Sequence, residues 1–138
     1  METDLKSVVR RFNRDVIERG DAAAFAALMA EDFINHSTPP GAPKGPEGMW
    51  ATFETILRPA ISYLRVEISD RIAEGDRVTT RKVITGRLTG PLMGLAPTGA
   101  PIRIEVIDIL RIRDGRYAEH WGINSLPAVL ASLRAVQG

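Results

Sequence analysis

The sequence has 138 residues, of which 44% are hydrophobic and 25% charged, the balance of an ordinary globular domain. Eighteen basic and seventeen acidic side chains give a net charge of +1, so charge does not indicate nucleic acid or an acidic membrane surface as a partner. The absence of cysteine excludes disulfides, thiolate metal sites and cysteine nucleophiles, and no apolar run has the length of a membrane helix or a signal peptide. We expect a single domain, residues 1–138, in the cytoplasm.

Apolar residues at helical spacing predict two consecutive helices at the start of the chain. The first covers residues 4–19, with Asp4 as its N-cap and Gly20 at its end. Asp21 caps a second, alanine-rich helix whose apolar stripe extends to Met29. The two helices are expected to form a wall or lid.

A short extended piece follows, in which the apolar pair Phe33 and Ile34 leads directly to Asn35 and His36. Residues 37–45 then form a loop rich in proline and glycine, which cannot be regular. At the mouth of this loop, Asn35 and His36 are candidates for binding a carbonyl or hydroxyl group of a ligand. The alternative is that Asn35 caps the following turn, a common use of asparagine.

A third helix is predicted from Pro46 to about Leu57, because proline suits the first turn of a helix and the helix is expected to stop before Pro59. Its expected buried side consists of Met49, Trp50, Phe53, Ile56 and Leu57. Trp50 and Phe53 are candidate ligand contacts, although such residues are more often part of the core.

The hydrophobic period then changes from 3.6 to two, which marks the passage from helices to a sheet. Two strands are predicted, Tyr63 to Ala73 and Val78 to Thr89. The loop after them, residues 90–99, carries three large apolar side chains, Leu92, Met93 and Leu95. An apolar loop is costly in water unless it covers something, so Met93 is a candidate to line a flat apolar ligand.

Residues 101–124 predict a hairpin, because Asp114-Gly115 lies between two strand-like runs. One face of the first run is apolar except for a single carboxylate: Ile102, Ile104, Val106, Asp108, Leu110 and Ile112. The returning strand brings His120 and Trp121 close to the level of Asp108. Pro127 opens a last helix of about nine residues.

Helices first, then an antiparallel meander and a closing helix define an α+β fold. We expect a curved antiparallel sheet that wraps around the N-terminal helices and encloses a cone with a hydrophobic floor.

Four segments resemble the SnoaL-like polyketide cyclases and their "ester cyclase" relatives in the nuclear transport factor 2-like superfamily. They are Asp32-Phe-Ile-Asn-His, the loop from Thr85 to Gly99, the run from Ile107 to Arg116, and Glu119-His-Trp-Gly. The resemblance covers nearly the whole chain and implies the cone-shaped fold of that superfamily.

In the characterised cyclases, such a domain closes a polycyclic aromatic polyketide by an intramolecular aldol step without a cofactor or metal. A carboxylate two residues after the histidine matching His120 acts as acid and base, and a histidine occupies the position of Asp108. This sequence has Gly122 in place of that carboxylate. Such cones commonly pair through the open face of the sheet, so the resemblance also implies a homodimer, with which the outward-facing Ile107 and Ile109 agree.

Asp108 is the strongest catalytic candidate. Burial disfavours the charged form of a carboxylate and is expected to raise its pKa, the condition of a base that removes a proton beside a carbonyl. The alternative is a structural salt bridge to an arginine on a neighbouring strand, such as Arg81 or Arg87. His120 could share a proton with Asp108 or orient a substrate oxygen. Strand alternation lets only one of His120 and Trp121 point fully inward unless the strand bulges, and we expect it to be His120.

These residues favour a cofactor-independent acid/base enzyme, of cyclase or isomerase type, acting on a small apolar oxygenated molecule such as a polyketide. Asp108 and His120 would be catalytic, and six residues would contact the substrate: Asn35, His36, Trp50, Phe53, Met93 and Trp121. A non-catalytic small-molecule binding protein is the alternative. Epoxide hydrolysis is a weaker one, because it usually needs two carboxylates. Two histidines 84 positions apart make a weak metal site.

Overall fold

The computed structural model describes residues 2–137, and the side chains of residues 5–137. The first helix, α1 (Glu2–Arg11), continues as a π-helical stretch, η1 (Phe12–Glu18), as the periodicity predicts. It begins before Asp4, so Asp4 lies inside the helix and the predicted N-cap is wrong. Gly20 ends the helical segment with φ of +70°, and its N–H donates to the Val16 carbonyl.

Asp21 caps α2 (Ala22–Leu28), its side chain accepting a hydrogen bond from the Ala24 N–H at 3.1 Å. The chain then becomes extended at Met29, which opens β1 (Met29–Asn35) instead of closing the helix. Met29 pairs with Tyr117 of the last strand, so a partner distant in sequence decides its conformation. The apolar stripe predicted for the second helix is therefore one residue too long.

The third helix is longer than expected. It runs through α3 (Pro46–Ala51), the π-helical η2 (Thr52–Leu57) and α4 (Arg58–Ala60), and Pro59 does not stop it. Pro59 is the second residue of α4, in the last turn of this continuous helical run. Arg58 fixes this end of the helix by donating to the carbonyls of Val16 and Ile17 at 3.0 and 2.7 Å.

Four long strands follow in sequence: β2 (Ile61–Glu74), β3 (Arg77–Leu88), β4 (Pro101–Arg113) and β5 (Arg116–Asn124). Their order in the sheet is β1-β5-β4-β3-β2, with antiparallel neighbours except for β1, which is parallel to β5. The meander, the Asp114-Gly115 turn and the closing helix α5 (Leu126–Gln137) agree with the prediction. The parallel edge strand was not predicted.

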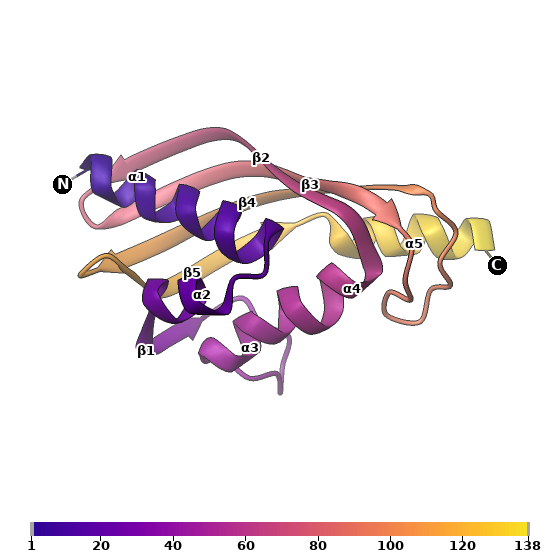
Figure 1. Cartoon of the computed structure of the whole chain (residues 1–138), viewed down its shortest axis with the longest axis horizontal. Helices are drawn as coiled ribbons and strands as arrows, with labels where there is room; N and C mark the ends of the chain where they lie inside the picture. Colours follow the sequence, from indigo (N-terminus) through magenta and orange to yellow (C-terminus); the bar gives the residue numbers. More distant parts are fainter. Residues whose placement is uncertain (1, 138) are drawn as a thin grey trace.

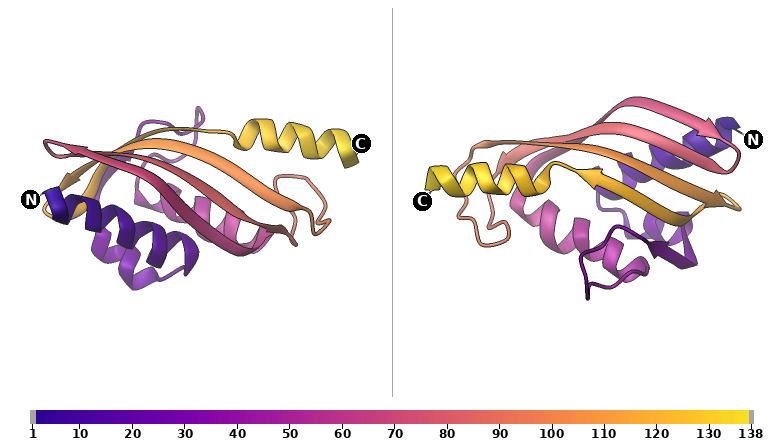
Figure 2. Two further views of the ribbon diagram at one scale, coloured as in Figure 1. Left: turned by 90° about the horizontal axis from the view of Figure 1, so that it is seen from above. Right: turned by 180° about the vertical axis from the view of Figure 1, so that it is seen from behind.

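The helices α1 to α4 cover one face of the curved sheet, here called the inner face, while α5 extends beyond its end (Figures 1 and 2). The predicted apolar face of β4 is the inner one, and Ile102, Ile104, Leu110 and Ile112 are buried there. Ile56, expected in the core, is exposed on the third helix. The α+β fold with a cone-shaped, curved sheet around N-terminal helices is thus confirmed.

The loop between β3 and β4 closes the far end of the core. Leu92 and Leu95 bridge each other and are buried, as an apolar loop requires. Met93 lies between them with φ of +48° and is 54% exposed, because the turn points its side chain to solvent. Met93 therefore does not line the core or a cavity behind this loop.

Candidate functional site

Asp108 lies on the inner face of β4 and is only 5% exposed. The register places it opposite Thr80 on β3 and Gly122 on β5. One carboxylate oxygen, Oδ2, faces two nitrogen atoms: Lys82 Nζ at 3.6 Å and His120 Nε2 at 3.4 Å. The expectation of a carboxylate and an imidazole close together on an apolar surface is therefore met.

Lys82 is the cation that the sequence analysis missed. It is 5% exposed, and its ammonium group donates to Asn13 Oδ1 at 2.6 Å, while Asn13 donates to the Val9 carbonyl at 2.8 Å. The proposed alternative partners of Asp108 are engaged elsewhere: Arg81 with Asp70, and Arg87 with a loop carbonyl. The sequence did contain a signal for Lys82: its alternate position on β3 places it on the same face of the sheet as Asp108.

The inner-face positions of β3 are Val78, Thr80, Lys82 and Ile84, all buried. An arginine at an odd-numbered position of this strand faces the other side of the sheet. Asp108 therefore could pair with Lys82 but not with Arg81.

Burial pushes the pKa of Asp108 upward, but the attraction of Lys82 and of His120 outweighs it, so the pKa of this carboxyl lies below its ordinary value. The expectation of a raised pKa is wrong, because it left out a buried cation. Asp108 is an ionised carboxylate at neutral pH. Nearby, burial raises the pKa of Tyr117 well above its usual value and the charge of Asp108 adds to this, so the phenol stays neutral.

His120 is held from two sides. Its Nδ1 lies 2.9 Å from Asn35 Oδ1, which also accepts the backbone N–H of Ser37 at 3.0 Å. Because the backbone N–H of Ser37 can only donate, the Asn35 atom that it contacts must be the amide oxygen. That oxygen can only accept, so His120 Nδ1, which contacts it too, must carry a proton. Nε2 is then the nitrogen that faces the Asp108 carboxylate, at a distance beyond the ordinary hydrogen-bond range. Asn35 thus both caps the following turn and accepts a hydrogen bond from His120.

His36 and Trp121 lie on the outer face of the sheet. Their rings stack with centroids 4.9 Å apart, and His36 Nε2 lies 2.7 Å from a carboxylate oxygen of Glu119. Hydrogen bonds from Arg111 and from His36 keep the pKa of Glu119 below its usual value. Trp121 pairs with Ile109 and therefore points away from Asp108, which agrees with the predicted alternation of His120 and Trp121. Neither His36 nor Trp121 can share a pocket with Asp108.

Trp50 and Phe53 belong to an aromatic cluster between the helices and the sheet. Trp50 packs against Phe25 with centroids 4.9 Å apart, and Phe53 packs edge-on against Phe12 at 6.2 Å. Phe12 in turn stacks on Tyr117 at 4.4 Å. Both candidates are half-buried, so they form part of the core and present an edge outside it.

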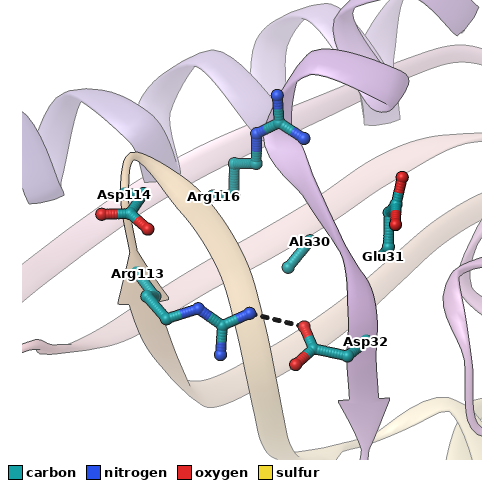
Figure 3. A pocket seen from close by; sticks show the side chains of 6 residues that line it. All are labelled: Ala30, Glu31, Asp32, Arg113, Asp114 and Arg116. Carbon is teal, nitrogen blue, oxygen red and sulfur yellow. Dashed lines mark hydrogen bonds and ion pairs between the residues drawn. The ribbon is translucent and has the colours of Figure 1, made fainter.

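Two hollows in the described surface are lined by neither Asp108 nor His120. The larger, about 650 Å³, is an open cleft beside the β4–β5 turn, lined by Ala30, Glu31, Asp32, Arg113, Asp114 and Arg116 (Figure 3). Within it, Arg113 and Asp32 pair with each other. The smaller, about 280 Å³, includes Asn13 and three arginines, of which Arg14 pairs with Asp15. In each hollow at least one charged side chain is thus already paired.

Among the described side chains, those of residues 5–137, no three from histidine or carboxylate residues are grouped so that they could hold a metal ion. The same residues contain no helix with the length and hydrophobicity that crossing a membrane requires.

The chemical capacity of the site is proton transfer. An imidazole with a defined protonated nitrogen, Nδ1, presents its second nitrogen beside a permanent negative charge. Such a carboxylate stabilises the imidazolium ion that forms when Nε2 takes up a proton. His120 is more accessible than Asp108, with 17% of its side chain exposed against 6%. A ligand therefore meets the imidazole first.

Solved structures with the same fold include several of bacterial origin. IdmH from Streptomyces antibioticus, a proposed polyketide cyclase, has 28% identity and a TM-score of 0.81 over 94% of this chain and 98% of its own. A proposed SnoaL-like polyketide cyclase from Jannaschia sp. CCS1 has 26% identity and a TM-score of 0.81 over 97% and 94%. AclR from Streptomyces galilaeus, a proposed hydroxylase, has 23% identity and a TM-score of 0.84 over 98% and 83%, which supports the fold alone.

A search among curated proteins finds no match. The sequence profile of the SnoaL-like polyketide cyclases, by contrast, matches residues 7–133. That span begins in the first helix and includes Asn35, Lys82, Asp108 and His120 on the four strands that build the site. With a match over nearly its full length, the chain belongs to the SnoaL-like polyketide cyclase family.

Proposed function

We propose that this protein catalyses proton transfer at a carbon next to a carbonyl group, with His120 as the acid/base and Asp108 as the anion that stabilises its protonated form. The single observation that carries the proposal is the imidazole held between Asn35 Oδ1 and Asp108 Oδ2 on the inner face of the sheet. Asp108, which the sequence analysis regarded as the base, takes the supporting role because its lowered pKa leaves it a weak proton acceptor.

The steps balance without an added reagent. His120 Nε2 removes a proton from the carbon beside the carbonyl, which leaves an enolate and an imidazolium paired with ionised Asp108. In a cyclisation, the enolate carbon attacks a second carbonyl of the same molecule, and the resulting alkoxide takes the proton back from Nε2. In an isomerisation, the proton returns to another carbon. The Nδ1 proton stays on Nδ1, hydrogen-bonded to Asn35 Oδ1, so Nε2 is the nitrogen that takes up and returns the proton.

The family supports a small oxygenated molecule of polyketide type as the substrate. Members of the SnoaL-like family with the same fold include proposed polyketide cyclases of 26–28% identity. Trp50 and Phe53, whose rings are half-buried against the core, suit the apolar body of such a molecule.

The test is deuterium uptake from heavy water into a panel of ketones and phenolic polyketide analogues. We expect wild-type protein to promote exchange at carbons next to carbonyls, and both His120→Gln and Asp108→Asn to lower the rate by about a hundredfold or more. His36→Gln is the matched control, since this second histidine lies on the outer face, and it should keep the wild-type rate. Wild-type exchange by His120→Gln would overturn the proposal.

A non-catalytic binding protein is the second candidate. It is favoured by the low exposure of Asp108 and by the fact that both nitrogen atoms of His120 already face acceptors. It predicts stoichiometric binding of an apolar compound without exchange at any pH. Epoxide hydrolysis is less favoured, because Asp108 is the only buried carboxylate among the described side chains.

A homodimer through the outer face is part of the proposal. Ile107 and Ile123 pair across β4 and β5 and are both exposed there, at 54% and 82%. Trp121 and Ile109 continue this apolar strip along the same two strands. A second copy that covers the strip would remove it from water.

A further inference from the structure

His120 reaches Asp108 along a diagonal of the sheet. In the β4–β5 register His120 stands opposite Leu110, while the residue opposite Asp108 is Gly122. Side chains two positions apart on a strand share a face, so the imidazole must lean over position 122 to place Nε2 at 3.4 Å from Asp108 Oδ2. Position 122 therefore lies directly under the contact on which proton transfer depends.

There is no room for a side chain at that position. A Cβ atom on Gly122 would lie 2.9 Å from His120 Cε1, 3.0 Å from His120 Nε2 and 3.2 Å from Asp108 Cβ. Each contact is shorter than normal van der Waals contact between such atoms. The space that a side chain at position 122 would occupy is thus taken up by the imidazole ring of His120.

The backbone does not explain the glycine. Gly122 is not among the glycines with positive φ, so its conformation is open to any residue. Its N–H donates to Ser37 Oγ at 2.7 Å, a bond that every residue except proline could make. Space, rather than conformation or hydrogen bonding, is what the glycine supplies.

We infer that Gly122 is a positioning residue: its lack of a side chain lets His120 lie against Asp108, and any larger residue separates the two. The inference rests on the proposed function for its catalytic consequence, but the geometric part stands without it. The nearest atoms to an added Cβ belong to a ring at the end of a rotatable side chain, so an alanine is accommodated by turning the imidazole rather than by unfolding the sheet. The imidazole then loses the carboxylate that stabilises its protonated form.

The experiment uses the two histidines of the chain, which give two sets of imidazole ¹⁵N signals. We expect Gly122→Ala to shift the His120 Nε2 resonance and to leave His36 unchanged. Introduced alone, Asp108→Asn should also shift the His120 Nε2 resonance. Introduced into the Gly122→Ala protein, the same substitution should shift that resonance little further. An undiminished effect of Asp108→Asn in that background would overturn the inference.

Deuterium exchange is the second measurement, and Gly122→Ala should lower the exchange rate at least tenfold with little change in substrate KM.

Gly75→Ala is the control for lost stability. Gly75 has φ of +61° with nothing within 4 Å of an added Cβ, so the substitution strains the backbone without touching the site. It should leave both the His120 signal and the exchange rate at wild-type values. If wild-type protein exchanges no compound, the proposed function fails while the spectroscopic test of Gly122 still decides the inference. Unchanged exchange in Gly122→Ala would also overturn it.

Discussion

Lys82 is the residue that sets the charge state of the site. Two opposite charges, each about 95% buried, lie 3.6 Å apart on adjacent strands, and Asn13 satisfies the ammonium group from the helix above. Such a pair adds modest stability compared with an apolar pair, but removing one partner leaves a buried charge without compensation. The site therefore depends on a residue that never has to touch a substrate.

We expect Lys82→Met to lower the free energy of unfolding by about 3–5 kcal/mol at pH 7, since Asp108 is left as a buried anion beside His120 alone. Arg81→Met is the matched control on the same strand: its pair with Asp70 is exposed and is worth about 1 kcal/mol or less. Urea unfolding of the three proteins measures both values. Equal losses in the two variants would contradict this account of Lys82.

The loss of stability in Lys82→Met is also expected to depend on pH. The pKa of Asp108 is lowered in the folded protein, so its stabilising contribution is complete above the unfolded value and is lost as pH falls through the folded value. The difference in free energy of unfolding between wild type and Lys82→Met should therefore narrow as pH falls below about 4, where Asp108 of the unfolded chain begins to take up a proton.

At the level of elements, the β4–β5 hairpin decides which side chains meet. Its two-residue turn has positive φ at both positions, +53° at Asp114 and +73° at Gly115, which matches the right-handed twist of the flanking strands. The register that starts there places Asp108 opposite Gly122, after a bulge between Arg111 and Ile112. A turn at the protein surface thus fixes the geometry of the buried site.

We expect Gly115→Ala to destabilise the protein by about 1–2 kcal/mol, because a residue with a Cβ atom pays for left-handed backbone. Asp114→Asn is the control at the neighbouring position and should change stability little, since both residues tolerate this conformation. Thermal unfolding followed by circular dichroism measures the two variants. A neutral Gly115→Ala would show that the turn does not need its glycine.

The hairpin and the alternation of its strands could be predicted because they depend on neighbours in sequence. The pairing of β1 with β5 could not, since it joins Met29 to Tyr117 and leaves no local pattern. For the same reason the stacking of His36 on Trp121 was not foreseen. Lys82 could have been predicted, because strand alternation places it on the inner face of β3. It was not, because a lysine is rarely buried in a protein core.

At the scale of the whole molecule, the outer face of the sheet exposes large apolar side chains to water. Ile123 is more exposed than Ile107, and both lie in a strip bordered by the Arg111–Glu119 pair. We expect a dimer in solution at micromolar concentration, and Ile123→Lys should convert it to a monomer, because a charged group would have to be buried in the contact. Light scattering coupled to gel filtration gives the mass. Ile72→Lys is the control on another exposed isoleucine, at the far edge strand, and should leave the mass unchanged.

The contact between Asn35 and His120 spans 85 positions of the chain. Loop closure over such a distance costs entropy that only the finished sheet repays, so native pairings of this kind tend to form late in folding. The ribosome must release β5 before β1 can find its neighbour. A chain that stops between β1 and β5 has Asn35 but lacks His120, so the proposed proton-transfer site can form only once the last strand has been made.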